Sequence, residues 1–171
     1  MPSPVGHALG GLILHSILSR GGSTGHAGAL VAVTAACAPD LDLVLNVTLG
    51  PHHHRGPSHS VGAAVAAGLL VFALACWRGS ARAAARLGLL AGAGWLSHVA
   101  LDWLGSDSRA PYGIMALWPF SRSFFVAPFP LFLDVGRELT WRTMRDNTVA
   151  AAWESVLLCP VLWLARRRGS A

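Results

Sequence analysis

The sequence predicts an all-α membrane protein, a polytopic bundle of three to five apolar helices with one interfacial amphipathic segment. Of the 171 residues, 53% are hydrophobic and only 12% are charged, whereas soluble domains contain about 25% charged residues. The mean hydropathy is +0.50, which excludes a disordered chain and most soluble enzymes of this size. At this length we expect a single domain covering residues 1–171.

Three apolar runs are long enough to cross a bilayer, which takes about 17–25 residues of helix. These runs are Ser60–Trp77, Leu87–Leu104 and Thr148–Ala165. The N-terminal part is ambiguous, because Val5–Leu18 is short and Ala27–Leu49 is interrupted at Pro39. Either both segments span, with the second kinked at the proline, or they form a helical hairpin that enters the bilayer partway. We favour two spans.

Arginine supplies all 13 basic residues, and the formal net charge is +5. Two groups of arginines lie between or after apolar runs, at Arg78, Arg82 and Arg86 and at Arg166, Arg167 and Arg168. This is the pattern of the positive-inside rule, so we expect both groups in the cytoplasm and no nucleic-acid partner. The chain then alternates so that residues 49–59 and 105–147 lie outside, as in a multi-pass protein of the plasma (inner) membrane.

The segment from Gly105 to Asn147 combines charges, prolines and aromatic side chains. Its aromatic residues predict an interfacial belt, made of Trp118, Phe120, Phe124, Phe125 and Phe129. An interfacial helix is expected over Leu131–Arg145. The acidic residues of the second half that follow the predicted site are expected to be surface or interface charges: Asp107, Asp134, Glu138, Asp146 and Glu154.

Ionisable residues within or beside apolar runs are rare and usually functional. Here they form four groups: His7, the pair Asp40 and Asp42, the stretch from His52 to Ser60, and the pair His98 and Asp102. On the predicted topology, each group arrives at the same outer end of the bundle. The sequence therefore predicts one shared site on the extracytoplasmic side.

The chemistry of these groups fits a metal ion. His98 and Asp102 are four residues apart, so on a helix their side chains share a face. Imidazole and carboxylate ligands together favour zinc, with manganese or iron as alternatives. Asp40 and Asp42 follow a helix-breaking proline and supply the carboxylates that a second ion or a general base requires. A hydrogen-bonded structural pair at His98 and a helix cap at Asp40 are the alternative interpretations.

The stretch between the second and third apolar segments supplies further ligands. His54 and His59 flank a Gly-Pro turn, which lets two imidazoles of a short loop converge. Arg55 offers its planar fork to a phosphate or a carboxylate. The same histidines would also be compatible with a solvated loop.

Several motifs in this order resemble the YdjM-like family. They are an early histidine (His7), PDLD from Pro39, HRGPSHS from His54, SHVALD from Ser97 and GIMALWPF from Gly113 to Phe120. Members are described as LexA-binding, inner-membrane-associated metal-dependent hydrolases, although we do not expect LexA as a partner. The resemblance covers about residues 6–120 and implies one metal-dependent site formed by His7, Asp40, Asp42, His54, His59, His98 and Asp102. Ser58 stands where the family usually has threonine, which keeps the hydroxyl, and the tail from Phe124 matches no motif.

The leading hypothesis is a membrane-bound hydrolase with one or two divalent ions, zinc first, acting on a lipid or lipid-linked phosphoester at the membrane surface. Asp40 or Asp42 would serve as general base and Arg55 would bind the substrate anion. A metal transporter or sensor is the first alternative, with a site near the bilayer midplane. A non-catalytic structural membrane protein is the second.

Overall fold

The computed structural model describes residues 1–19, 24–48 and 54–167. Arg20, His52, His53 and Arg168 lie outside this described part. The helices are α1 (Pro4–Leu18), α2 (Gly25–Cys37), α3 (Asp42–Thr48), α4 (Val61–Cys76), α5 (Ala81–Trp103) and α6 (Trp141–Arg167). The predicted all-α class is confirmed.

Three helical segments are long and apolar enough to span a membrane: Gly25–Val44, Ala81–Trp103 and Trp141–Arg167. The predicted span Ser60–Trp77 is shorter than expected, because α4 has 16 residues. At 1.5 Å per residue such a helix is about 24 Å long, less than the roughly 30 Å of a hydrocarbon core. Its start is fixed by Ser60, whose hydroxyl accepts a hydrogen bond from the Ala63 amide (3.0 Å).

The expected kink at Pro39 is present and shapes the second segment. Helix α2 ends at Cys37, a 3₁₀ turn follows over Ala38–Leu41, and α3 begins at Asp42. Proline lacks an amide hydrogen and clashes with the preceding helical turn, which explains why the helix tightens there. The irregular backbone turns Asp40 and Asp42 toward the other helices.

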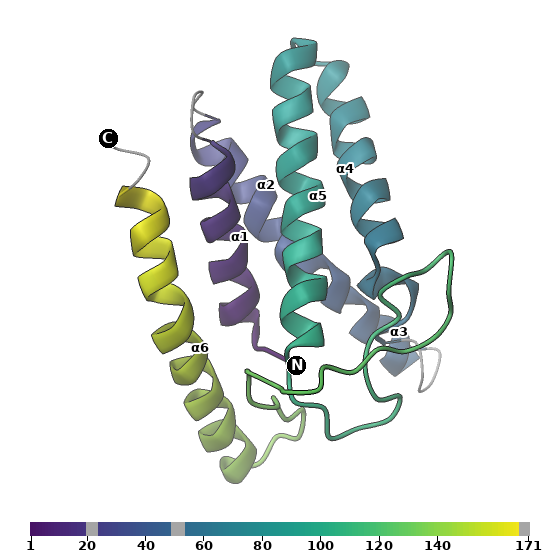
Figure 1. Cartoon of the computed structure of the whole chain (residues 1–171), viewed down its shortest axis with the longest axis vertical. Helices are drawn as coiled ribbons and strands as arrows, with labels where there is room; N and C mark the ends of the chain where they lie inside the picture. The colour runs from purple at the N-terminus through teal and green to yellow at the C-terminus, as the bar shows by residue number, and fades with distance from the viewer. Residues whose placement is uncertain (20–23, 49–53, 168–171) are drawn as a thin grey trace.

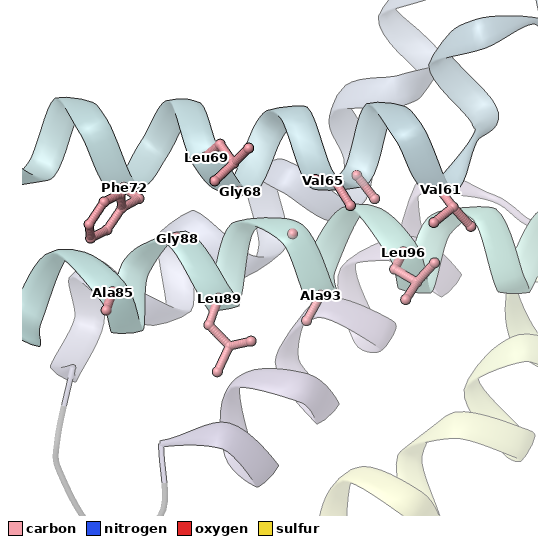
Figure 2. A pocket seen from close by; sticks show the side chains of 12 residues that line it. Val61, Val65, Gly68, Leu69, Phe72, Ala85, Gly88, Leu89, Ala93 and Leu96 are labelled. Atoms are coloured by element: carbon pink, nitrogen blue, oxygen red, sulfur yellow. The ribbon is translucent and has the colours of Figure 1, made fainter. Parts of the chain in front are cut away.

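Helix α5 lies between α4 and the pair α1 and α2, and α6 covers the outer side of α1 (Figure 1). Helices α4 and α5 approach closely at two glycines. A Cβ atom on Gly88 would lie 2.8 Å from the Gly68 carbonyl oxygen. Figure 2 shows the apolar groove beside this contact, lined by side chains of both helices such as Leu69 and Leu89.

Helix α2 packs on both neighbours through Ala32, which is fully buried. A Cβ atom added to Gly11 of α1 would lie 2.8 Å from the Ala32 carbonyl oxygen, and one added to Gly94 of α5 would lie 2.5 Å from it. These contacts allow the three helices to approach at backbone distance, as small residues do in membrane bundles.

Gly94→Ala is expected to destabilise the protein although alanine is the better helix former by about 1 kcal/mol. The added methyl group meets a backbone carbonyl, so α2 and α5 must separate, and overpacking of this kind costs about 1–3 kcal/mol. Thermal unfolding in detergent measures the change. Gly79→Ala is the matched control, because its Cβ would meet nothing nearer than the Ala75 oxygen at 3.7 Å. Equal melting temperatures for the two variants would contradict the packing argument.

The segment between α5 and α6 is irregular and folds across one end of the bundle (Figure 1). The predicted helix over Leu131–Arg145 is wrong in its first part, since α6 begins only at Trp141. The backbone there is used differently: the Leu131 amide donates to Leu104 (2.7 Å) and the Ser106 amide donates to Phe132 (2.8 Å). Pro128 and Pro130 just before this pairing also disfavour a helix.

The two ends of the bundle differ in character. The N-terminus, the C-terminal end of α5 and the irregular segment lie together at one end, while the α4–α5 connection and the C-terminal end of α6 lie at the other (Figure 1). Arg78 lies in that connection, and Arg166 and Arg167 lie in the last turn of α6. The arginine groups that were predicted to face the cytoplasm therefore share one end of the molecule.

Candidate metal centre

The predicted ligand residues come together at the end opposite those arginine groups. They are supplied by the first turn of α1, the kink after α2, the loop before α4 and the last turns of α5, and they are His7, Asp40, Asp42, His54, His59, His98 and Asp102. The imidazoles of His7, His59 and His98 are fully buried. Asp40 is the more open member, with 18% of its side chain exposed.

Four of these residues point one ligand atom each at a common position. His59, His98, Asp40 and Asp102 place these atoms within 4.8 Å of one another. His59 Nε2 lies 3.0 Å from His98 Nε2 and 3.2 Å from Asp102 Oδ2, and Asp40 Oδ1 lies 3.6 Å from each of the two imidazole nitrogens. Tetrahedral zinc with ligands at about 2.0–2.1 Å requires ligand atoms about 3.3 Å apart. The spacing therefore fits a tetrahedral ion.

His7 faces the opposite oxygen atoms of the same two carboxylates. Its Nε2 lies 3.3 Å from Asp102 Oδ1 and 3.9 Å from Asp40 Oδ2, and its ring stacks on His98 at 3.9 Å between centroids. Both carboxylates thus present one oxygen to the four-residue group and one to His7. Two carboxylates arranged in this way could be shared between the ions of a two-ion centre, which lie about 3.5–4 Å apart.

The hydrogen bonds behind the imidazoles determine which nitrogen is free. His98 Nδ1 lies 2.8 Å from the Ala36 carbonyl oxygen, so it must donate and leave the Nε2 lone pair for a ligand. His59 Nδ1 lies 3.2 Å from Asp42 Oδ2 and leaves Nε2 in the same way. Metal-binding histidines typically donate their second N–H to a carboxylate or a backbone carbonyl.

Asp42 belongs to a second group with His54 and His59 that has metal-ligand spacing. Its carboxylate already accepts hydrogen bonds from the Ser58 hydroxyl (2.5 Å) and the Arg55 amide (3.2 Å), and His54 Nδ1 lies 2.5 Å from it. These partners leave Asp42 with less free ligand capacity than Asp40 or Asp102. The geometry therefore favours Asp42 as the group that orients His59 and His54.

Unpaired polar atoms provide an independent test of whether the residues fit an ion. Within the described residues, both ring nitrogens of His7, Oδ1 of Asp40 and both carboxylate oxygens of Asp102 are buried without a hydrogen-bond partner. Leaving such groups unsatisfied costs about 1–3 kcal/mol each and more for charged groups. A cation bound among them would coordinate the carboxylate oxygens and Nε2 of His7, so the residues present fit a metal ion.

The pKa values of His54 and His59, the two histidines of the loop, shift in opposite directions. Burial disfavours the charged form of His59, but the carboxylates of Asp102, Asp40 and Asp42 outweigh it and raise its pKa well above the usual value. Burial lowers the pKa of His54, and the contact with Asp42 compensates only in part. The carboxylates therefore favour a positive charge at this position, which a proton on His59 or a bound cation would supply.

Arg55, predicted to offer its fork to a phosphate or a carboxylate, already binds a carboxylate of the protein. It is buried, it forms an ion pair with Asp107, and its φ of 67° is a left-handed conformation that non-glycine residues rarely adopt. Asp107, predicted as a surface or interface charge, is instead largely buried against Arg55. Glu154, predicted likewise, is fully buried in α6, and the ionisable-residue rule for apolar runs could have identified it.

Sequence comparison matches the chain to the family described as YdjM inner membrane protein over residues 1–169. The match extends past Phe120 into the tail that carried no recognisable motif. No curated protein and no solved structure matches the chain.

Proposed function

The chain belongs to the YdjM family of inner membrane proteins, and from that premise we propose that it is a membrane-embedded metal-dependent hydrolase. The observation that carries the proposal is the buried set of imidazole and carboxylate atoms that converge on one position without other partners in the described part of the chain. His59, His98, Asp40 and Asp102 would hold one ion, zinc by preference. His7, with the outer oxygens of the same carboxylates, would hold a second.

A bound divalent ion supplies a Lewis acid that activates water and stabilises charge on a reacting oxygen. In a centre with one ion, Asp40 is the residue best placed as general base, because its carboxylate is the more open one and Oδ2 would stay free of that ion. Asp42 holds the His59 ring in place. Arg55, held in position by Asp107, would offer its remaining N–H donors to a substrate anion at the edge of the site.

The position of the centre supports hydrolysis at the membrane surface. Asp102 is the penultimate residue of α5, which spans Ala81–Trp103, so the site lies near the end of a span. A transporter would require a site near the midplane that opens to both sides. We propose a lipid or lipid-linked phosphoester as substrate, because such a molecule can diffuse into the site within the bilayer plane. The arginine groups at the opposite end favour an extracytoplasmic site by the positive-inside rule.

The proposal is tested by the metal content and the hydrolytic activity of the purified protein. Wild type is expected to retain a transition metal and to hydrolyse a phospholipid or a generic phosphodiester. His59→Ala and His98→Ala are each expected to lower metal affinity at least tenfold, since even losing a group that orients a ligand costs about 10–100-fold. If the protein binds metal but hydrolyses none of the substrates, the metal site is retained and the proposed hydrolase activity is rejected. If wild type binds no metal and both variants fold equally poorly, the result would support a structural role for these histidines.

A further inference from the structure

A small polar pocket adjoins the metal centre on the side of His54. It has a volume of about 60 Å³, and its walls include Asn46, His54, Arg55, Arg109 and Arg137. One water molecule needs about 10–15 Å³ measured in this way, so the pocket has room for a group the size of a tetrahedral oxyanion. It is too small for a whole lipid.

Two of the three arginines are fixed by carboxylates. Nη1 of Arg55 pairs with Asp107. Nη2 of Arg109 pairs with Asp134 at 3.2 Å and donates to the Val135 carbonyl oxygen at 2.6 Å. A guanidinium has five N–H donors, so within the described residues these contacts leave most donors of both side chains unused. The arginines are held in position and retain donors for a ligand.

Arg137 is the one arginine of the three in this pocket that pairs with no carboxylate within the described residues. Within the described chain it forms no ion pair, and its hydrogen-bond contact is with the sulfur of Met1 at 3.3 Å, a weak acceptor. Partial burial lowers the pKa of Arg137, and the charges of Arg109 and Arg55 lower it further, against a smaller opposing effect of Asp40 and Asp134. Asp107 pairs with Arg55, and Asp134 pairs with Arg109 and with the N-terminal ammonium group. Within the described residues no carboxylate pairs with Arg137, and a bound anion would supply this missing partner.

His54 connects this pocket to the metal centre. It lines the pocket, and its Nδ1 lies 2.5 Å from Asp42, the residue behind His59. We propose that the pocket formed by Arg55, Arg109 and Arg137 binds a phosphate group beside the metal centre. Arginine forks match the geometry of phosphate oxygens and bind them through charge-assisted bonds. Phosphate binding stands on the pocket alone, whereas assigning that phosphate to the substrate rests on the proposed hydrolase.

The test measures the affinity of the full-length protein, as purified in detergent, for two probes by titration calorimetry. The probes are inorganic phosphate and a short-chain phosphatidic acid. Arg137→Gln is the informative variant, because Arg137 is exposed and its loss breaks no ion pair within the described structure. Bonds to charged groups contribute about 1.5–3 kcal/mol, so we expect the affinity to fall about 10- to 100-fold. Arg137→Lys keeps the charge but loses the fork and should be intermediate.

The matched control is Arg142→Gln, another exposed arginine outside the pocket, which should bind both probes like wild type. Binding of phosphatidic acid alone would identify a membrane lipid as the source of the phosphate, and binding of both probes would admit a free phosphate compound. Failure of wild type to bind either probe, or equal affinities of Arg137→Gln and wild type, would overturn the pocket. Arg137-dependent binding without hydrolysis would instead retain the pocket and reject the hydrolase.

Discussion

Asp102→Asn is expected to abolish high-affinity metal binding while leaving the protein folded. Asp102 offers Oδ2 to His59 Nε2 at 3.2 Å and Oδ1 to His7 Nε2 at 3.3 Å, so it is the carboxylate nearest to both proposed ion positions. Asparagine keeps the volume but removes the charge and turns an amide N–H₂ donor toward one of the positions. Because losing a group that merely orients a ligand costs about 10–100-fold in affinity, we expect at least about a 100-fold loss here.

Metal analysis of the purified variant and the stabilisation of the protein by added zinc measure this effect. A ligand present at 100 times its Kd stabilises the folded state by about 2.7 kcal/mol, so zinc should raise the melting temperature of wild type and not that of Asp102→Asn. Asp146→Asn is the control, since Asp146 is an exposed carboxylate on α6 that pairs only with Arg145 in the described structure. If zinc stabilises Asp102→Asn as much as wild type, Asp102 is not a metal ligand and the proposed metal centre is wrong.

That the ligand residues lie at one end of the bundle could be predicted, because the positions of the motifs within the apolar runs are visible in the sequence. Each motif stands at the end of an apolar run, and alternation of the runs across a bilayer sends every second end to the same side. The i, i+4 spacing of His98 and Asp102 and the kink at Pro39 also follow from elementary helix geometry. No knowledge of packing was needed to bring these residues to one end.

The parts that the sequence did not predict depend on contacts between distant segments. Arg109 and Arg137 are unremarkable charges in an irregular segment until the chain folds back over the centre and places them beside His54. The helix predicted over Leu131–Arg145 failed for a related reason, because Leu131 pairs with the backbone of Leu104. Neither the position of the two arginines nor the contact between Leu131 and Leu104 leaves a periodic pattern in the sequence, and periodicity is the signal that predicts secondary structure.

Glu154, predicted as a surface or interface charge, is instead fully buried, and its contacts predict a large effect on stability. Its carboxylate lies in the middle of α6, fully buried, and accepts hydrogen bonds from the Ser3 amide at 2.7 Å, the Ser3 hydroxyl at 2.5 Å and the Gly6 amide at 3.0 Å. These donors belong to the start of α1, where the helix dipole also favours a negative charge. Glu154 therefore fastens α6 to the helix that carries His7.

Glu154→Ala is expected to destabilise the protein by at least about 3 kcal/mol, because three donors lose their acceptor and each costs about 1–3 kcal/mol when left unsatisfied. Unfolding in a graded denaturing detergent measures the loss, and Glu138→Ala at an exposed position is the control. Glu154→Gln separates stability from site geometry, since its amide retains one acceptor oxygen and should recover part of the stability. Because Gly6 precedes His7, both variants should also weaken metal binding, and Glu154→Gln should do so while still folded. If Glu154→Ala unfolds like Glu138→Ala, the contact between α6 and α1 contributes nothing that the remaining helix packing does not already supply.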